Sequence, residues 1–321
     1  MTAATPQPAR RASTRQAAGE AILELARRGV DVVAVSADTS KSMYTALLKE
    51  EFPERFVDTG IAEQNMMMVA AGLAATGKIA FAASYSVFTS MRCCEQLRTF
   101  VAYPGLNVKV IAGIGGFSAG IEGATHVATE DLGIVRCIAG VAVVAPADAA
   151  STRKAVLAAA AYPGPVYLRV GRDPSPVLFD DGHAFEIGTA VRHRAGNHVT
   201  VLATGLVLAE ALQAHDLLRR EGIEADVIEV HTLKPILNPD LIVESALRTR
   251  KVVTVEEHNV VGGLATAVAE ILVGRGALAL VKLGLADTFA ESGTPEELLV
   301  KHRLKAPLLV EEIRTLVARA D

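Results

Sequence analysis

The sequence predicts an α/β protein of two doubly wound domains, the first with a mainly parallel sheet and the second smaller. Short Val- and Ile-rich runs alternate with Ala-rich segments along the whole chain, which is typical of parallel strands covered by helices on both faces. Half of the 321 residues are hydrophobic but only 4% are aromatic, and this aliphatic composition favours layered α/β packing. A Pro-, Asp- and Gly-containing segment from Arg172 to His183 interrupts both patterns and predicts a linker between the domains.

The first domain is expected over residues 14–172, after a flexible tail over residues 1–13. Its strands are the most continuous apolar runs, at Val30–Ser36, Ile79–Ala83, Val108–Ala112, Val141–Ala145 and Val166–Arg169. Its helices are the amphipathic or Ala-rich segments between them, at Arg15–Arg28, Ile61–Thr76, Phe88–Tyr103 and Ala149–Ala161.

After a linker over residues 173–190, a shorter α/β series is expected over residues 191–321. Its strands are predicted near Val199–Ala203, Ala225–Val230, Val252–Val255 and Ala279–Leu283. Its helices are predicted near Leu206–Glu221, Pro239–Leu247, Leu264–Val273, Pro295–His302 and Val310–Arg319. The two series are not sequence repeats of each other.

Composition argues against several classes of function. The net charge is -4 and no basic stripe is present, which argues against nucleic-acid binding. No apolar run approaches the roughly 18 residues needed to cross a bilayer, and the N-terminus has no apolar signal segment, so we expect a cytoplasmic protein without membrane contact. Cys93, Cys94 and Cys137 have no metal-ligand spacing, which favours reduced thiols.

The segment from Asp58 to Met66 places an acidic residue at the N-terminus of an apolar helix. Gly60 follows a predicted short strand, and Glu63 falls in the first helical turn, where the helix dipole favours a carboxylate. One interpretation is that Glu63 is simply such a favourable charge. However, the helix behind it is apolar almost all round, and a buried carboxylate is costly without a dedicated partner. This favours a functional role for Glu63.

This segment, with the blocks described next, resembles the transketolase family from about Thr14 to about Leu304. The resemblance implies a pyrimidine-binding domain followed by a transketolase C-terminal domain. It also implies that Glu63 is catalytic and contacts the aminopyrimidine of thiamine diphosphate. In such enzymes the cofactor's own 4′-imino nitrogen removes its C2 proton, which requires a proton or strong hydrogen bond at ring nitrogen N1′. A buried carboxyl group can share that proton.

Other positions match cofactor contacts of the family. The resemblance implies that Ile61, in the same segment as Glu63, and Asp38, after the first strand, lie at the cofactor, although helix capping is an alternative for Asp38. Phe88 matches the ring that stacks on the aminopyrimidine. Met91 and Cys94 stand where transketolases are commonly aromatic, and they can pack on the ring or belong to the core.

A further set of positions matches the family's substrate contacts. Arg15 opens the first helix, and Ser42 follows the first strand; a solvated first-turn residue and a helix cap are the alternatives. Glu122 and His126 lie in a Gly-rich loop that resembles the family's contact to sugar hydroxyls, with His126 as a second catalytic residue. Arg172 corresponds to a phosphate ligand, for which guanidinium is well suited.

Two departures from the transketolase pattern bear on the substrate. Transketolases usually carry Asp where this chain has Glu122, and a His where it has Ile114, so we expect a modified, unphosphorylated or otherwise unusual ketose as substrate. Arg169 is an alternative phosphate ligand. The segment Glu256–His258 has no second His at metal-ligand spacing, and the family resemblance implies a structural C-terminal domain, so no catalytic or metal-binding residue is assigned there.

The sequence contains no Gly-Asp-Gly motif, which in thiamine-diphosphate enzymes precedes a distal Asn and binds the Mg²⁺ that holds the diphosphate. We therefore expect a subunit of a split transketolase, active only with a partner that carries that motif and Mg²⁺, in a heterotetramer that acts on sugars or sugar phosphates. The alternatives are the β subunit of a 2-oxo acid dehydrogenase, a deoxyxylulose-phosphate-synthase-like enzyme, and a non-catalytic scaffold. The pair Glu122 and His126 favours sugars, and Glu63 with Phe88 argues against a scaffold.

Overall fold

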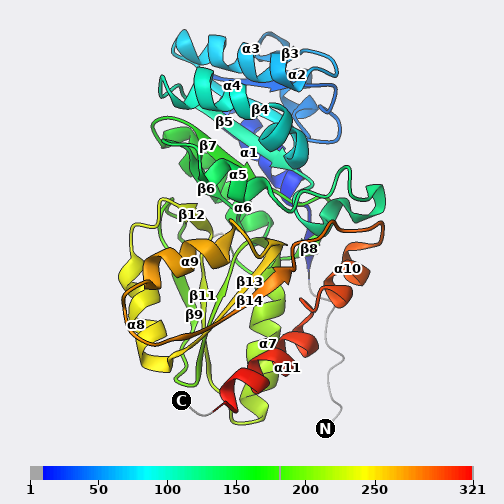
Figure 1. The fold of residues 1–321 in the computed structure, drawn as a ribbon. Helices are drawn as coiled ribbons and strands as arrows, with labels where there is room; N and C mark the ends of the chain where they lie inside the picture. Colours follow the sequence, from blue (N-terminus) through cyan, green and yellow to red (C-terminus); the bar gives the residue numbers. More distant parts are fainter. Residues whose placement is uncertain (1–9, 181, 320–321) are drawn as a thin grey trace.

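The computed structural model describes residues 10–180 and 182–319, and it confirms the predicted α/β class (Figure 1). A seven-stranded and a five-stranded sheet, each with helices on both faces, form two domains that lie one above the other in the figure. Of the tail expected over residues 1–13, residues 1–9 lie outside the described residues. Arg11–Ala12 forms strand β1, which pairs antiparallel with β8 (Ser175–Pro176) inside the expected linker.

The first sheet has the order β12-β6-β7-β5-β4-β2-β3 and is parallel except for β12. Its strands are β2 (Val32–Ser36), β3 (Phe56–Asp58), β4 (Ile79–Tyr85), β5 (Val108–Gly113), β6 (Ala142–Val144), β7 (Val166–Arg169) and β12 (Thr232–Lys234). The five long strands predicted for this domain are thereby confirmed, with small shifts at their ends.

Both faces of this sheet are buried, which explains why its strands are continuously apolar. Alternate residues of a strand point to opposite faces. In β2, Val33 and Val35 join the core cluster under α3, whereas Val32 and Ala34 join the cluster under α1. The helices of the domain are α1 (Thr14–Arg27), α2 (Ala46–Glu51), α3 (Glu63–Ala75), α4 (Cys94–Gln96), α5 (Asp131–Arg136) and α6 (Ala149–Ala161), with short 3₁₀ helices η1 (Pro53–Arg55) and η4 (Phe117–Glu122).

The helix predicted over Phe88–Tyr103 is not a regular α-helix. It consists of π-helical turns η2 (Phe88–Arg92) and η3 (Leu97–Ala102) on either side of the short helix α4. A π-helical turn widens the helix and changes the direction in which the following side chains point, and such turns are frequent at functional sites. The amphipathic pattern predicted a helix but could not distinguish its hydrogen-bond spacing.

The second sheet has the order β14-β13-β10-β11-β9 and is parallel except for β9. Its strands are β9 (Val191–Arg194), β10 (Val199–Ala203), β11 (Ala225–Glu229), β13 (Lys251–Asn259) and β14 (Ala279–Leu285). Its helices are η5 (Gly205–Val207), α7 (Leu208–Arg220), α8 (Pro239–Thr249), α9 (Leu264–Leu272), α10 (Pro295–Lys301) and α11 (Ala306–Val317). In Figure 1, α7 and α11 lie side by side along one flank of this sheet.

The two domains share structure across their junction. Strand β12 follows β11 in the chain but pairs with β6 of the first sheet. One apolar cluster contains Val143 of the first sheet and Ile228 of the second, and another contains Phe117 and Val255. The described part of the chain contains no helix that is both long and apolar enough to span a membrane.

Candidate active site

The predicted site residues gather where the parallel strands of the first sheet end. Ser42 follows β2, Glu63 follows β3, and Tyr85 is the last residue of β4. The loop after β5 carries His126, and Arg172 follows β7. The carboxyl ends of parallel strands meet at one edge of a sheet, which is the usual ligand crevice of α/β folds. Arg15 reaches this edge from the first turn of α1.

Glu63 is the first residue of α3 and is almost fully buried, with 3% of its surface exposed. Its Oε2 accepts a hydrogen bond from Nη1 of Arg92 at 2.7 Å. The same guanidinium lies over the ring of Phe88, 4.3 Å from its centroid. Arg92 is itself half-exposed, so a buried carboxylate is held by a partner that water can reach.

Three aromatic or imidazole rings line the space beside this pair. Phe88 lies edge-on to His126 with ring centroids 5.3 Å apart, and Tyr85 stacks on Phe88 at 6.0 Å. Nδ1 of His126 lies 2.9 Å from Oγ1 of Thr125, which leaves Nε2 as the nitrogen that can meet a ligand. The rings therefore form a wall next to Glu63.

A second group of side chains connects to the first through Tyr85. The Tyr85 hydroxyl donates to Oγ of Ser42 at 3.1 Å, and Nη1 of Arg15 donates to the same oxygen at 2.8 Å. Nε of Arg15 donates to the backbone oxygen of Arg172 at 3.1 Å, and the Arg172 guanidinium forms an ion pair with Glu122. The structure thus brings together the five residues that were predicted to bind substrate: Arg15, Ser42, Glu122, His126 and Arg172.

The loop that carries Ser42 is positioned by a close backbone approach. Gly19 of α1 contacts Tyr44, and a Cβ atom at Gly19 would lie 2.6 Å from the Tyr44 carbonyl oxygen. Tyr44 has a φ of 58°, in the left-handed region that is uncommon for residues with a side chain. A small residue in α1 therefore allows the loop to bring Ser42 to Arg15.

The two arginines of this group make the region suitable for an anion. Burial lowers the pKa of Arg15, and the nearby Arg172 guanidinium also lowers it, while Tyr44 acts in the opposite direction. Arginine nevertheless stays protonated at neutral pH. Both guanidiniums line an open cavity of about 710 Å³, whose wall holds five arginines and three carboxylates: Arg10, Arg11, Arg15, Arg153 and Arg172 with Glu20, Asp173 and Asp180. An anionic group that entered here would relieve the repulsion between these cations.

Arg169, the alternative phosphate ligand, has a different position. It is 7% exposed, and its Nη2 donates to the carbonyl oxygens of Ala128 and Glu257 at 2.6 and 2.9 Å. Its Nε lies 3.2 Å from the Asp131 carboxylate. These contacts occupy Arg169 inside the domain junction, so the geometry favours Arg172 as the anion ligand.

Four predicted cofactor residues are not joined to these groups by hydrogen bonds or ion pairs within the described part of the chain. Asp38 has a φ of 58° and an exposed side chain, and its backbone N–H donates to the Asp58 carboxylate at 3.0 Å. Ile61 and Met91 are exposed, at 79% and 42%. Cys94 is half-buried and packs against the core cluster.

Sequence reasoning missed Arg92 and Tyr85. Arg92 stands four residues after Phe88, a spacing that places two helical residues on the same face, and Tyr85 ends a buried strand. These signals were present, but nothing local showed that Arg92 would reach Glu63. Ile114, which replaces the family His, is 1% exposed and packs into the domain junction.

The described residues, 10–180 and 182–319, bring together no group of three or more His, Cys, Asp or Glu side chains that could hold a metal ion. The thiol beside the site is also unreactive at neutral pH. Burial and the nearby Glu63 raise the pKa of Cys93 to about 12.

Comparison with known proteins agrees with this geometry. The model of the transketolase pyrimidine binding domain matches residues 10–176, and that of the transketolase C-terminal domain matches residues 188–307. The chain belongs to the transketolase family. The membership of the transketolase family that the sequence motifs indicated is therefore confirmed.

Individual members of the transketolase family cover the chain to different extents. The chain is 39% identical over 300 residues to the 6-deoxy-6-sulfo-D-fructose transketolase subunit SqwH of Clostridium sp. (strain MSTE9), which covers 94% of this chain and 93% of that protein. It is 32% identical to human transketolase, of which it spans 49%. A solved structure titled as a split gene transketolase, inactive beta4 tetramer, is 44% identical with a TM-score of 0.88, covering 95% of this chain and 98% of that one.

Proposed function

We propose that this chain is a subunit of a split, thiamine-diphosphate-dependent transketolase that transfers a two-carbon ketol unit from a ketose to an aldose. The observation that carries the proposal is the position of Arg92. Its planar guanidinium donates a hydrogen bond to the buried Glu63 and lies on the face of Phe88. A planar ring with a nitrogen that bears a proton would make the same two contacts.

The aminopyrimidine of thiamine diphosphate is such a ring, so the residues present fit the cofactor. Bound cofactor supplies the nucleophilic carbon that takes up the two-carbon unit. Glu63 Oε2 would hold the proton shared with the ring nitrogen, and the low exposure of Glu63 keeps water from competing for it. Phe88 would provide the stacking face, with Ile61, Met91, Cys94 and Asp38 as further contacts.

Arg92 must release Glu63 when the ring enters. Because Arg92 is half-exposed, its guanidinium regains water as it leaves, which lowers the cost of that movement. The exposed side chains of Ile61 and Met91 flank Glu63 and Arg92 in the sequence, and they would become covered by the cofactor or the partner.

The substrate would lie between the two groups of side chains that Tyr85 connects. His126 and Glu122 would contact sugar hydroxyls, and Ser42 would join them from the opposite loop. Arg15 and Arg172 would bind an anionic substituent, since bidentate guanidinium contacts are strong for phosphate-like groups. The ion pair of Arg172 with Glu122 has to open for this contact to form.

The partner is proposed to supply Mg²⁺ and the diphosphate site, because the sequence holds no Gly-Asp-Gly motif. The relative SqwH is named as a subunit, and the related structure is titled as an inactive tetramer of β chains. These names support a heterotetramer in which this chain associates with itself and with a motif-bearing subunit. Its cysteines are free thiols, which supports a cytoplasmic location.

Reconstitution tests this function. The chain alone should bind thiamine diphosphate weakly and show no turnover, whereas the chain mixed with a partner subunit that carries Gly-Asp-Gly should transfer ketol units in a Mg²⁺-dependent manner. Calorimetry that detects tight, Mg²⁺-dependent cofactor binding to the chain alone would contradict the division of the site. Assays with xylulose 5-phosphate and ribose 5-phosphate test the substrate: turnover as in an ordinary transketolase would contradict the expectation of an unusual ketose.

A further inference from the structure

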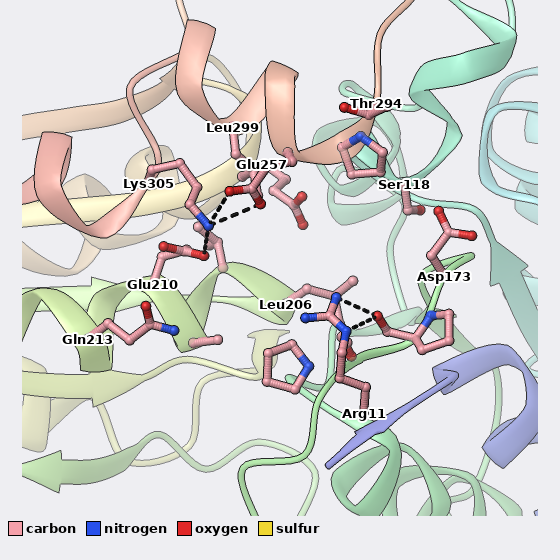
Figure 2. A pocket seen from close by; sticks show the side chains of 17 residues that line it. Arg11, Ser118, Asp173, Leu206, Glu210, Gln213, Glu257, Thr294, Leu299 and Lys305 are labelled. Carbon is pink, nitrogen blue, oxygen red and sulfur yellow. Dashed lines mark hydrogen bonds and ion pairs between the residues drawn. The ribbon is translucent and has the colours of Figure 1, made fainter. Parts of the chain in front are cut away.

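A cavity of about 330 Å³ lies at the junction of the two domains, apart from the candidate active site (Figure 2). Arg11 and the segment 173–176 line it from the first domain. The start of α7, Glu257 at the end of β13, the start of α10 and Lys305 line it from the second. None of the residues proposed above for cofactor or substrate binding lines this cavity.

Glu257 is the unusual member of this lining. It is 7% exposed, yet its carboxyl group has no hydrogen bond or ion pair with any of the described residues. Burial raises its pKa to about 7; the nearby Arg169 opposes this, and Glu210 adds to it. A buried carboxyl group without a partner is costly, and such groups in folded proteins usually have an unseen partner.

Two of the other three carboxylates of the wall, Glu210 and Glu296, have cationic partners, and the third, Asp173, is exposed. Glu210 accepts hydrogen bonds from Nζ of Lys305 at 2.7 Å and from the N–H of Ala306 at 2.9 Å. Glu296 lies 2.9 Å from the same Nζ. Figure 2 shows Lys305 directed toward Glu210. The lysine is therefore already paired and is not a counter-ion for Glu257.

The lining carries an excess of negative charge. It contains four carboxylates and two cationic side chains, and the second cation, Arg11, donates to the carbonyl oxygen of Pro174 at 2.7 and 3.1 Å. Between the charged groups the wall is apolar, formed by Leu206, Val207 and Leu299 among others. A ligand that fits this arrangement has at least one positive group, which would face Glu257, and a short hydrocarbon body.

We propose that the cavity is a binding site for a small organic cation, a primary ammonium group on a short carbon chain, with Glu257 as its counter-ion. The ligand would contact both domains and so stabilise their junction. The proposal does not depend on the proposed catalytic function, since this cavity is lined by none of the residues proposed to bind cofactor or substrate; it shares Arg11, Asp173 and Pro174 with the open cavity beside Arg15 and Arg172.

The test is isothermal titration calorimetry on the full chain with 1,4-diaminobutane, using uncharged 1,4-butanediol as the matched probe. We expect saturable binding of the diamine below about 10 mM and none of the diol, because only the amine can neutralise Glu257. Glu257→Gln keeps the shape of the side chain but removes its charge, and the variant should bind the diamine at least tenfold more weakly. Glu244→Gln, on the exposed face of α8, should leave binding unchanged.

The proposal would be overturned if the diol bound as tightly as the diamine. It would also be overturned if the wild type and Glu257→Gln bound the diamine with equal affinity. Absence of diamine binding at pH 8 would overturn it as well. The pH dependence adds a check, since the affinity should rise between about pH 6 and pH 8 as Glu257 ionises. The charged groups around it are Arg169 on β7 and Glu210 on α7. The cavity wall adds Glu296 on α10, Lys305 after α10, and Arg11 and Asp173 from the first domain. Circular dichroism of each variant excludes loss of folding.

Discussion

Glu63 and Glu256 are two buried glutamates in comparable places that are held in different ways. Each carboxylate lies at the start of a helix, where the helix dipole favours a negative charge. Glu256 accepts the backbone N–H groups of Leu264 and Ala265 at 2.6 and 2.9 Å and is fully buried. Glu63 is held by the half-exposed side chain of Arg92.

The difference shows which carboxylate can take part in binding. Backbone partners cannot leave without unwinding α9, so Glu256 is a permanent helix cap that joins β13 to α9. A guanidinium can rotate away, so Glu63 can exchange Arg92 for a ligand. Burial and helix position alone therefore do not separate a structural carboxylate from a functional one; the mobility of the partner does.

The largest effect should come from Glu63→Gln in the chain assembled with its partner. Gln keeps the shape but cannot share a proton with the cofactor ring, so turnover should fall by ~10²–10⁴, or roughly 3–5 kcal/mol. The stability of the chain should change little. Deuterium exchange at the C2 position of bound cofactor, followed by NMR, measures the step directly. An exchange rate equal to that of the wild type would remove Glu63 from the mechanism.

Glu256→Ala should act on stability and leave cofactor exchange intact. The substitution leaves two buried helix N–H groups without acceptors, which costs about 2–4 kcal/mol in the free energy of unfolding. Urea denaturation measures this, with Glu244→Ala on the exposed face of α8 as the control. A loss of cofactor exchange without a loss of stability would erase the distinction between the two glutamates.

Glu257→Gln tests a third situation, a buried carboxyl group that has no hydrogen-bond or ion-pair partner in the described part of the chain. Burial raises its pKa in the folded chain to about 7, above the ordinary value of 4.5. The folded state therefore binds the proton more tightly, and its stability falls as pH rises from 4.5 through 7. A Gln side chain does not ionise, so the variant does not lose stability in this pH range. Its free energy of unfolding should exceed that of the wild type at pH 8 by on the order of 1–3 kcal/mol and should be similar at low pH. If the free energy of unfolding had the same pH dependence in the wild type and in Glu257→Gln, the raised pKa of Glu257 would be contradicted.

Arg92→Lys should give the smallest effect. Lysine retains a cation within reach of Glu63 but loses the planar contact with Phe88, and half-exposed pairs contribute little, so the free energy of unfolding should change by less than about 1 kcal/mol. Thermal unfolding measures the change. A loss of several kcal/mol would mean that Arg92 is as fixed a partner for Glu63 as the backbone is for Glu256.

The helices and strands, and the segments that carry the candidate site residues, were predictable from the pattern of neighbouring residues in the sequence. The continuous apolar run of β2 predicted a strand buried on both faces, and the packing of Val33 and Val32 into opposite clusters explains that pattern. The resemblance to the transketolase family implied that Ser42, His126 and Arg172 are substrate contacts, and in the structure they follow β2, β5 and β7, which are parallel strands that end at one edge of the sheet.

Contacts between distant segments were not predictable in this way. The chain order put β12 in the second domain, yet it completes the first sheet, because pairing depends on which strand edge is exposed when the domains pack. The π-helical turns at Phe88 and Leu97 have the same apolar pattern as an α-helix, so only the packed structure distinguished them.

The sequence by itself determined the α/β class, the family and the residue types at the edge of the first sheet, because periodicity and motifs are local properties. The tertiary structure decided that Arg92 pairs with Glu63, that Arg169 is occupied inside the junction, and that the Glu257 carboxyl group has no partner among the residues described. The physical reason is that a buried charge takes its stability from groups far away in the chain, and only folding brings those groups within hydrogen-bond distance or leaves them out of reach.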